Sequence, residues 1–459
     1  MKVLLASAEL APLATSGGLG DAVAGIAHAE RALGLSVTVI MPRYQRLFDV
    51  GEPRPGEGPA NRIFTHWEGD VQVLLVDDPE SFDRPGIYGP EPGTGYPDEW
   101  WRWGRFCQVV GALSGQFDIV HLQDAQMAAA ALLSSSPTVL TLHNAAYPVI
   151  GPLAESVELF AENPAADQLL EWYGQANYLK AGILSADQVT TVSPGYARQI
   201  AEDPEVSSGL HEFLAGLEHP VIGIMNGIDI ERFDPAIDTD IPTPFGPETL
   251  EGRTLARRAL VDRTGIDGDG VIFGMVGRMA RQKGLELLDP VIDGLIADGL
   301  RLVAVGSGNE DAMVDAWVER APHAVWRAPY TEELARLTWA GGDSFLMPSR
   351  FEPGGLGNLY AMRYGAPPVV RLTGGLLTTV VDAVAGPGFG NGFGFYDYAP
   401  EALADTVHRA MGVFREQPEL WAALQHVGMT TDWGWEPAAR LYADVYQGVL
   451  DRAERSTSG

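Results

Sequence analysis

The chain alternates short apolar runs with stretches of helical periodicity, and this alternation constrains its fold more than any other feature. In the first half, residues 2–9, 36–42 and 117–123 read as strands, and residues 21–35 read as a helix between the first two. A strand, a helix and a further strand in this order favour a right-handed crossover with parallel strands, covered by helices on both faces. We therefore expect an α/β protein with a doubly wound parallel sheet.

The same pattern restarts in the second half of the chain. Five further apolar runs lie at residues 271–278, 300–308, 324–330, 343–350 and 367–375. Two such series predict two doubly wound, Rossmann-like domains. We place the first domain at residues 1–225, the second at 226–433, and a closing helix that crosses back to the first domain at 434–459. The joint lies in a Pro- and Asp-rich stretch at residues 226–235.

The composition excludes several classes of partner. The 459 residues carry 31 Lys and Arg against 61 Asp and Glu, which gives a formal net charge of −30. Nucleic acids and anionic membranes are bound by clustered cations, so we expect neither as a partner. The single cysteine, Cys107, forms no internal disulfide, which fits a reducing compartment. Glu9 interrupts the N-terminal apolar run, so we read that run as a strand and expect a cytoplasmic protein.

The first turn between a strand and a helix reads SAELAPLATSGGLGDAV. Gly17 and Gly18 let backbone N–H groups approach an anion at the start of a helix, where the helix dipole adds to the attraction. Asp21 can instead cap the helix, and an ordinary turn explains the stretch equally well. The turn lacks the Gly-Lys-Ser/Thr of a Walker loop and the spacing of a dinucleotide fingerprint.

Three more polar motifs follow strands, where parallel sheets bind their ligands. Arg278 and Lys283, in GRMARQKGLELL, suit a diphosphate leaving group because they would stabilise its growing negative charge; a solvated surface pair is the alternative. Glu352 precedes the glycines of SRFEPGGLGNLYAM, where it faces a sugar hydroxyl or Lys283, or simply caps a helix. His143 ends the strand of LTLHNAAY, where a structural histidine is the commoner case.

The order of these motifs resembles that of bacterial glycogen synthases and plant starch synthases. The matching stretches span nearly the whole chain and read KVLLASAELAP, LKAGILSADQVTTVSPGYARQI, NGID, GRMARQKGL, PSRFEPGGL, RLTGGLLTTVVD and WGWEPAARLYADVY. The resemblance implies a GT-B fold, with two Rossmann-like domains and a cleft between them. It also implies a retaining transferase that moves glucose from ADP-glucose to the non-reducing end of an α-1,4-glucan or maltooligosaccharide.

The resemblance assigns a catalytic set of four residues. Arg278 and Lys283 bind the diphosphate and stabilise the leaving group, and Glu352 holds the hydroxyls of the donor glucose. His143 contacts that glucose, and its backbone carbonyl steadies positive charge at the anomeric carbon. The leaving phosphate accepts the proton of the acceptor hydroxyl. The resemblance implies no metal and no cofactor, and the sequence contains no obvious cluster of metal ligands.

Further positions are implied to contact the donor. They are Thr15, Gly17, Gly18, Asp124, Asn226, Tyr330, Gly355, Leu356 and Gly357. The backbone N–H groups at residues 355–357 line the phosphate and sugar. Tyr330 stacks on the adenine, whereas Asn226 and Asp124 line the sugar side of the cleft.

The chain departs from the family in its first turn. The family reads Lys-x-Gly-Gly-Leu there, whereas this chain has Thr15 in place of the lysine. A charged contact to a phosphate contributes about 1.5–3 kcal/mol, so we predict weaker donor use or a changed donor. Thr15 or Ser16 can still donate a neutral hydrogen bond.

A second departure affects the acceptor side. The family usually reads His-x-His-Asp-Trp-His. This chain keeps the aspartate as Asp124, but Gln123, Ala125 and Gln126 replace the flanking His, Trp and His. The family's cysteine and hydroxyl-bearing residue near Glu352 are both glycine here, at residues 354 and 357. Two alternatives therefore stay open. One is a non-catalytic glucan-binding or regulatory homologue, and the other is a transferase that uses another nucleotide sugar or a small acceptor.

Overall fold

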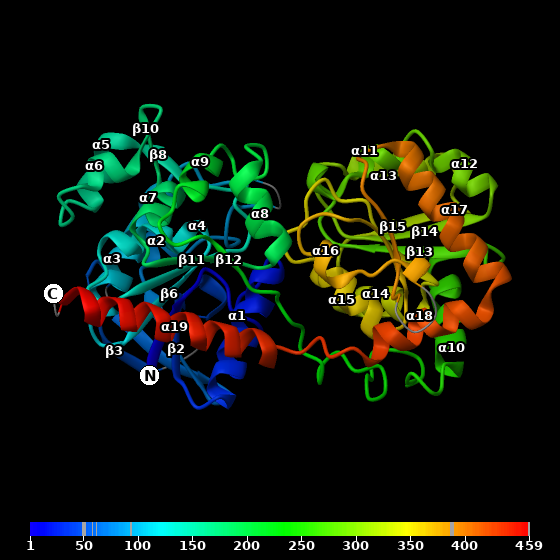
Figure 1. Cartoon of the computed structure of the whole chain (residues 1–459), viewed down its shortest axis with the longest axis horizontal. Helices are drawn as coiled ribbons and strands as arrows, with labels where there is room; N and C mark the ends of the chain where they lie inside the picture. Colours follow the sequence, from blue (N-terminus) through cyan, green and yellow to red (C-terminus); the bar gives the residue numbers. More distant parts are fainter. Residues whose placement is uncertain (48–51, 57, 61, 92–93, 386–389, 458–459) are drawn as a thin grey trace. The chain divides into compact units, whose positions relative to one another are not determined.

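A computed structural model describes residues 1–47, 52–56, 58–60, 62–91, 94–385 and 390–457. The chain divides into two compact units. The first comprises Met1–Gly227 and Trp435–Gly459, and the second comprises Ile228–Gly434. Each unit has its own large sheet (Figure 1).

The first unit contains a nine-stranded sheet in the order β12-β11-β7-β6-β1-β2-β5-β4-β3. Its strands are β1 (Lys2–Ala6), β2 (Ser36–Pro42), β3 (Glu52–Pro55), β4 (Arg62–Glu68), β5 (Val71–Asp77), β6 (Ile119–Gln123), β7 (Thr138–Leu142), β11 (Gln188–Thr191) and β12 (Ile222–Gly223). The strands from β12 to β5 pair in parallel, and parallel pairing is what the alternation predicts, although β5 itself was not predicted. The pairs β4–β5 and β3–β4 are antiparallel and were not predicted.

A smaller three-stranded sheet lies in the same unit and was also not predicted. Its strands are β8 (Ile150–Pro152), β9 (Glu171–Trp172) and β10 (Gln175–Asn177), in the order β8-β10-β9 with antiparallel pairing. Figure 1 shows its β9–β10 hairpin projecting at the end of the first unit that carries α5 and α6.

The helices of the first unit cover both faces of the large sheet. They are α1 (Gly18–Ala32), α2 (Pro79–Phe82), α3 (Glu99–Ser114), α4 (Ala125–Ala128), α5 (Leu153–Leu159), α6 (Ala166–Leu170), α7 (Tyr178–Ser185), α8 (Pro194–Glu202), α9 (His211–Ala215) and α19 (Glu436–Thr457), with 3₁₀ turns η1 (Gln45–Leu47) and η2 (Ala129–Leu132). The closing helix α19 packs beside α1. The Tyr446 hydroxyl of α19 donates to buried Glu30 of α1 at 2.6 Å.

The second unit contains a six-stranded, fully parallel sheet in the order β15-β14-β13-β16-β17-β18. Its strands are β13 (Val271–Val276), β14 (Leu300–Val305), β15 (Val325–Ala328), β16 (Ser344–Met347), β17 (Pro368–Arg371) and β18 (Phe393–Phe395). Each of the five apolar runs expected here contains one of the first five strands. The sixth, β18, is short and glycine-rich and was missed.

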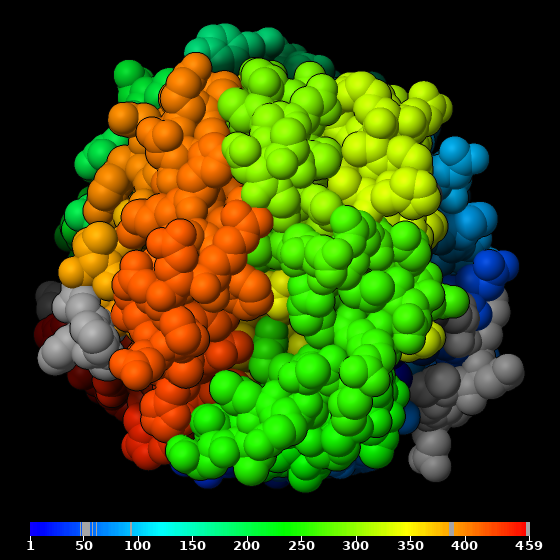
Figure 2. Space-filling view, turned by 90° about the vertical axis from the view of Figure 1, so that its right-hand side faces the viewer, coloured from blue at the N-terminus to red at the C-terminus, as the bar shows by residue number. Residues whose placement is uncertain are grey.

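Helices cover this sheet as well. They are α10 (Glu251–Thr264), α11 (Leu285–Leu288), α12 (Ile292–Ala297), α13 (Asp311–Arg320), α14 (Glu332–Gly341), α15 (Leu356–Arg363), α16 (Leu376–Thr379), α17 (Pro400–Glu416) and α18 (Pro418–Thr430), with 3₁₀ turns η3 (Arg281–Lys283) and η4 (Ala383–Ala385). On one surface of the unit, α17 and α18 (orange) lie beside α10 (green) (Figure 2). Within the described ranges, no helix is long and apolar enough to cross a membrane.

Candidate functional site

An ion pair joins two turns at neighbouring strand ends in the second unit. Lys283 ends η3 after β13, and Glu352 lies in the turn after β16. The Lys283 Nζ lies 2.7 Å from Glu352 Oε2, and the Ser349 hydroxyl donates to the same oxygen at 3.0 Å. Glu352 is only 6% exposed. The structure therefore shows the alternative in which this carboxylate faces Lys283.

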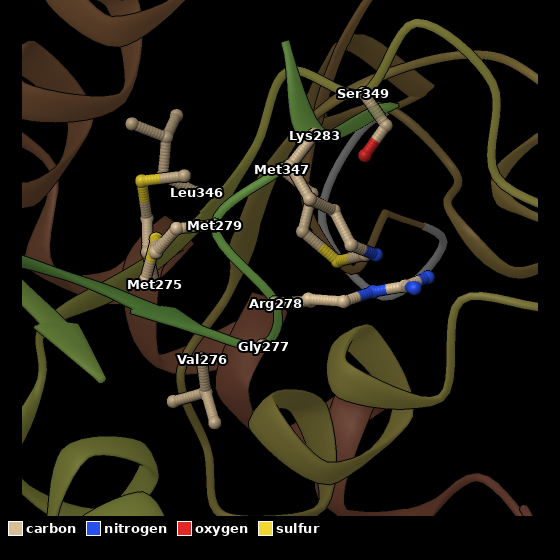
Figure 3. A pocket seen from close by; sticks show the side chains of 9 residues that line it. All are labelled: Met275, Val276, Gly277, Arg278, Met279, Lys283, Leu346, Met347 and Ser349. Carbon is tan, nitrogen blue, oxygen red and sulfur yellow. The ribbon is translucent and has the colours of Figure 1, made fainter. Parts of the chain in front are cut away.

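A small pocket that is partly open to solvent lies beside this pair. Its lining residues are Met275, Val276, Gly277, Arg278, Met279, Lys283, Leu346, Met347 and Ser349 (Figure 3). Arg278 and Lys283 project into it from the same turn, whereas methionine and leucine side chains form much of the rest of its wall. The structure thus brings two of the predicted diphosphate ligands together, next to the predicted sugar ligand.

Close backbone packing holds the two turns together. Gly284 follows Lys283 with φ +70°, and a Cβ there would collide with the carbonyl oxygen of Pro348. Only glycine adopts this left-handed conformation readily and leaves room for the carbonyl. The Arg350 N–H also donates to the Gln282 carbonyl at 2.9 Å. The position of Lys283 relative to Glu352 is therefore fixed by the backbone.

A layer of polar side chains supports the same turns from behind, and sequence reasoning missed it. Glu286 Oε1 accepts hydrogen bonds from the Tyr398 hydroxyl at 2.6 Å and from Arg350 Nη2 at 3.0 Å. Arg371 Nη1 donates to the Arg350 carbonyl at 2.6 Å. These residues come from four separate stretches of the chain, so no local spacing signalled them.

The glycine-rich start of α15 lies directly after Glu352. Gly355 is the N-cap of this helix, with φ +73° and without a side-chain cap. The interpretation of Glu352 as the helix cap is therefore wrong, because the helix begins later. The Gly375 N–H donates to the Glu352 carbonyl at 2.8 Å, which fixes the backbone of this turn. The contact of residues 355–357 with a donor stays a prediction.

Tyr330 lies two residues after β15, at the edge strand of the same sheet, and its ring is exposed. Its strand is separated from β13 by β14. Stacking of this ring on an adenine stays a prediction.

In the first unit, His143 and Asp124 follow the neighbouring strands β7 and β6. The His143 Nε2 lies 2.8 Å from the Gln123 Oε1, and Gln123 is fully buried. Burial lowers the pKa of His143 to about 3, so its imidazole is neutral at physiological pH. Gln123, which replaces a histidine of the family, therefore forms a hydrogen bond with His143.

Asp124 is held at the start of α4 in an unusual conformation. Its φ is +66° and its ψ is −176°, a backbone conformation that is adopted almost only by glycine. The Asn144 N–H donates to its Oδ1 at 3.3 Å. Burial raises the pKa of Asp124 to about 7, although backbone N–H groups oppose this rise. This carboxyl group therefore changes charge near neutral pH.

The first glycine-rich turn folds around Glu9. One oxygen of this buried carboxylate accepts the N–H groups of Ser16 at 2.6 Å and Gly17 at 3.2 Å. Its other oxygen accepts from the Tyr88 hydroxyl at 2.6 Å. Burial raises the pKa of Glu9 despite these hydrogen bonds. Two of the N–H groups in the turn that was expected to bind an anion are therefore already engaged.

The side chains and backbone of this turn remain on the surface. Thr15, Gly17 and Gly18 are exposed. The helix begins at Gly18 with Gly17 as its N-cap, so Asp21 lies in the first turn and does not cap the helix, contrary to that alternative. Sequence reasoning treated Glu9 only as an interruption of an apolar run, because residue types alone do not show which backbone groups a carboxylate accepts.

Asn226 is buried near the end of the first unit, although we placed it at the start of the second domain. Its amide oxygen has no hydrogen-bond partner within the described part of the chain. Over the same part of the chain, no group of three or more His, Cys, Asp or Glu is placed to hold a metal ion.

Two Rossmann-like units with cations at a strand end define the chain as a glycosyltransferase of the GT-B class. Residues 2–216 match the family model of the starch synthase catalytic domain, and residues 256–412 match that of glycosyl transferases group 1. The chain belongs to the glycogen synthase family. The predicted family and fold class are thereby confirmed.

Similar proteins cover nearly the whole chain. The glycogen synthase of Moorella thermoacetica is 36% identical over 98% of this chain and 97% of its own length. The glycogen synthase of Syntrophotalea carbinolica is 35% identical over 98% of this chain and 99% of its own length. The structure of the catalytic domain of Starch Synthase IV from Arabidopsis thaliana, bound to ADP and acarbose, superposes with a TM-score of 0.86 at 27% identity, covering 98% of this chain and 99% of that one.

Proposed function

We propose that the protein transfers glucose from ADP-glucose to the non-reducing end of an α-1,4-glucan, with retention of configuration at the anomeric carbon. The observation that carries this proposal is the Lys283–Glu352 ion pair beside Arg278 at the pocket of the second unit. A protein that only bound glucan would need no cationic clamp of this kind.

Arg278 and Lys283 would bind the diphosphate of the donor. As the bond between phosphate and sugar breaks, negative charge grows on the phosphate, and fixed cations stabilise that charge in the transition state. Glu352, held by Lys283 and Ser349, would accept hydrogen bonds from the glucose hydroxyls. The backbone N–H groups of residues 355–357 would complete the contacts to phosphate and sugar.

The first unit would supply the sugar-side contacts. Neutral His143 would contact the donor glucose, and its backbone carbonyl would steady positive charge at the anomeric carbon. Asp124 and Asn226 would bind sugar hydroxyls. The bond from the anomeric carbon to the diphosphate breaks, the acceptor oxygen bonds to that carbon, and the leaving phosphate takes the acceptor's proton. That the donor lies between the two units stays a prediction.

ADP-glucose is the proposed donor, without a metal or other cofactor. The presence of ADP in the similar starch synthase structure supports an adenine nucleotide, and exposed Tyr330 is suited to stack on its base. We also propose a cytoplasmic location, which the free, buried thiol of Cys107 supports.

Nucleotide release tests this proposal. Purified protein is given ADP-glucose or UDP-glucose, with or without maltotriose or glycogen, and Lys283→Ala is compared with Lys2→Ala, which removes an exposed lysine from the first strand. We expect ADP release that depends on the acceptor, its near loss in Lys283→Ala, and wild-type rates in Lys2→Ala. Acceptor-dependent release that survives Lys283→Ala would overturn the assigned role of the ion pair.

A second candidate is a non-catalytic glucan-binding homologue, or a transferase with a different donor. The observation that favours it is the first turn, where Thr15 replaces the family's lysine and Glu9 already engages two N–H groups. Glucan binding without nucleotide release from any sugar nucleotide would support the binding protein. Release from UDP-glucose in preference to ADP-glucose would support the changed donor.

A further inference from the structure

Two side-chain hydrogen bonds cross from β6 to β7 in the same diagonal direction. Gln123 lies opposite Thr141 in the strand register, but its Oε1 lies 2.8 Å from Nε2 of His143, two residues further along the chain. His121 lies opposite Val139 and bonds in the same way to the Thr141 hydroxyl at 2.6 Å. Residues two apart on a strand share a face of the sheet. These side chains therefore lie in one column, with His143 at its end.

The backbone of His143 is held separately, by the residue that follows Gln123. The Asp124 N–H donates to the Thr141 carbonyl at 2.8 Å, and the Asp124 carboxylate accepts the N–H groups of His143 and Asn144. Asp124 does this in its glycine-like conformation, and backbone strain of this kind is concentrated at functional sites. Gln123 therefore acts on the imidazole ring of His143, whereas Asp124 acts on its main chain.

The amide nitrogen of Gln123 destabilises the fold. The residue is fully buried, and within the described part of the chain this nitrogen has no hydrogen-bond partner. A buried donor without a partner costs about 1–3 kcal/mol, and a methionine would fill a similar volume without that cost. The packing of the core therefore does not explain a glutamine at this position, whereas the hydrogen bond from its oxygen to His143 does.

The amide oxygen of Gln123 determines which nitrogen of His143 carries the proton. Because burial lowers the pKa of His143 to about 3, the ring is neutral at physiological pH and has one N–H donor and one acceptor nitrogen. An amide oxygen can only accept, so Nε2, which faces it, carries the proton. The other nitrogen, Nδ1, is then left as the acceptor of the ring.

We propose that Gln123 is a positioning residue for the transfer reaction. It orients the His143 ring and holds it in the Nε2–H tautomer, so that Nδ1 accepts a hydrogen bond from a hydroxyl of the glucose that is transferred. This inference rests on the proposed function, in which His143 contacts that glucose. Glutamine has no titratable group. The replacement of the family's histidine at residue 123 therefore keeps a hydrogen bond to His143 and removes a second titratable ring beside it.

NMR of the His143 ring, combined with steady-state kinetics of the full chain, tests the inference. Gln123→Met removes the amide at similar volume, and Gln123→Glu keeps an acceptor oxygen. Gln188→Met is the matched control. Gln188 is also buried, its amide donates to the Val189 and Pro220 carbonyls, and it begins β11, away from the strand end that carries His143. Long-range nitrogen–proton spectra of protein with labelled histidine report the tautomer, and His143→Asn identifies the signal. ADP release from ADP-glucose with maltotriose as acceptor gives kcat and KM.

We expect the wild type and Gln123→Glu to carry the proton on Nε2 of His143, and Gln123→Met to show a mixture of both tautomers. In Gln123→Met, kcat should fall about threefold to tenfold, the effect of losing one neutral hydrogen bond. KM for ADP-glucose should not change, because the cations of the second unit are proposed to bind the diphosphate. Gln123→Glu should retain most of the wild-type kcat. Gln188→Met should lower the melting temperature, since it removes two hydrogen bonds, but keep the tautomer and kcat of the wild type.

Three outcomes would overturn the inference. One is a proton on Nδ1 of His143 in the wild type, because the amide nitrogen of Gln123 would then face the ring. Another is a wild-type tautomer and kcat in Gln123→Met, and the third is an equal loss of kcat in Gln188→Met, which would trace the effect to general destabilisation. If the wild type releases no nucleotide, the proposed function fails instead, and the tautomers of the wild type and Gln123→Met still decide whether Gln123 orients the ring.

Discussion

Each unit places a buried glutamate beside a glycine-rich turn, but the two carboxylates accept hydrogen bonds from different groups. In the first unit, Glu9 accepts the N–H groups of Ser16 and Gly17, which belong to the turn itself. In the second unit, Glu352 accepts from the side chains of Lys283 and Ser349. The first carboxylate therefore uses donors that an anion would need, whereas the second holds a cation at the pocket.

This difference suggests a division of roles between the turns. In the first turn, Glu9 already accepts two backbone N–H groups, so a phosphate would depend mainly on side chains there. At the position of the family's lysine, that side chain is the neutral Thr15. The second unit keeps two cations, Arg278 and Lys283, at its pocket. We infer that most of the binding energy for a diphosphate comes from the second unit in this chain.

The largest expected effect comes from breaking the Lys283–Glu352 pair. We expect Lys283→Ala to lower kcat about a hundredfold to a thousandfold, as loss of a preorganised electrostatic contact does. Glu352→Ala should be similarly impaired. Because the two groups act as a unit, the double variant should be little worse than either single one. Additive losses in this double-mutant cycle, measured as ADP release, would mean that the two residues act independently.

A smaller gain is expected from restoring charge to the first turn. Thr15 is exposed, so a lysine there can reach the solvent-facing side of the turn without displacing the core. We expect Thr15→Lys to improve kcat/KM for the donor about tenfold to a hundredfold, the contribution of one charged hydrogen bond. Ser16→Lys serves as the neighbouring control. An unchanged kcat/KM for the donor in Thr15→Lys would show that this turn no longer contacts phosphate.

The sequence predicts most of the parallel strands because they are continuous apolar runs between helices, but it misses the parallel strands β5 and β18. The runs around β13 and β16 also locate Lys283 and Glu352 at neighbouring strand ends. The antiparallel strands β3 and β4 and the small sheet of β8, β9 and β10 were missed. The strands β8, β9 and β10 have only two or three residues each and carry no periodicity of their own, so their pairing is fixed by tertiary contacts.

The site could be predicted only where chemistry resides in local residue types. An Arg, a Lys and a Glu near glycines indicate a phosphate or sugar site from spacing alone. The engagement of the Ser16 N–H by Glu9 could not be predicted, because it depends on the path of the backbone. The hydrogen bond from the Tyr398 hydroxyl to Glu286 could not be predicted for another reason. These two residues lie 112 positions apart in the sequence.

Substitutions of Glu9 test whether the first glycine-rich turn depends on the hydrogen bonds that this carboxylate accepts. Removing its carboxylate in Glu9→Ala leaves two N–H groups and the Tyr88 hydroxyl without their acceptor, which should lower the free energy of unfolding of the first unit by about 1–3 kcal/mol. Glu9→Gln keeps an acceptor oxygen and should lose less. Chemical denaturation of the two variants checks this order. Equal stability of Glu9→Ala and the wild type would show that the turn does not depend on this carboxylate.

The pH dependence of the free energy of unfolding of the same variants gives a more specific test. The pKa of Glu9 is raised in the folded protein above its ordinary value of 4.5, so the folded state binds the proton more tightly than the unfolded chain does. The stability that this group contributes is present below about pH 4.5 and is lost as pH rises through the raised folded pKa. Glu9→Gln should lack this loss. Glu30, whose pKa burial raises to about 8, acts with the same sign in both proteins and cancels in the difference.

The smallest expected effect concerns the sugar side of the first unit. The pKa of Asp124 is raised to about 7, and that of His143 is lowered to about 3. An ionised Asp124 accepts hydrogen bonds from sugar hydroxyls more strongly than its neutral form, so kcat/KM should rise about fivefold as pH increases through 7. His143 should add no inflection between pH 5 and 8. Asp124→Asn should flatten the profile, whereas Asp444→Asn, on the exposed face of α19, should leave it unchanged. An inflection that persists in Asp124→Asn and vanishes in His143→Asn would assign the titration to the His143 imidazole and not to the Asp124 carboxyl group.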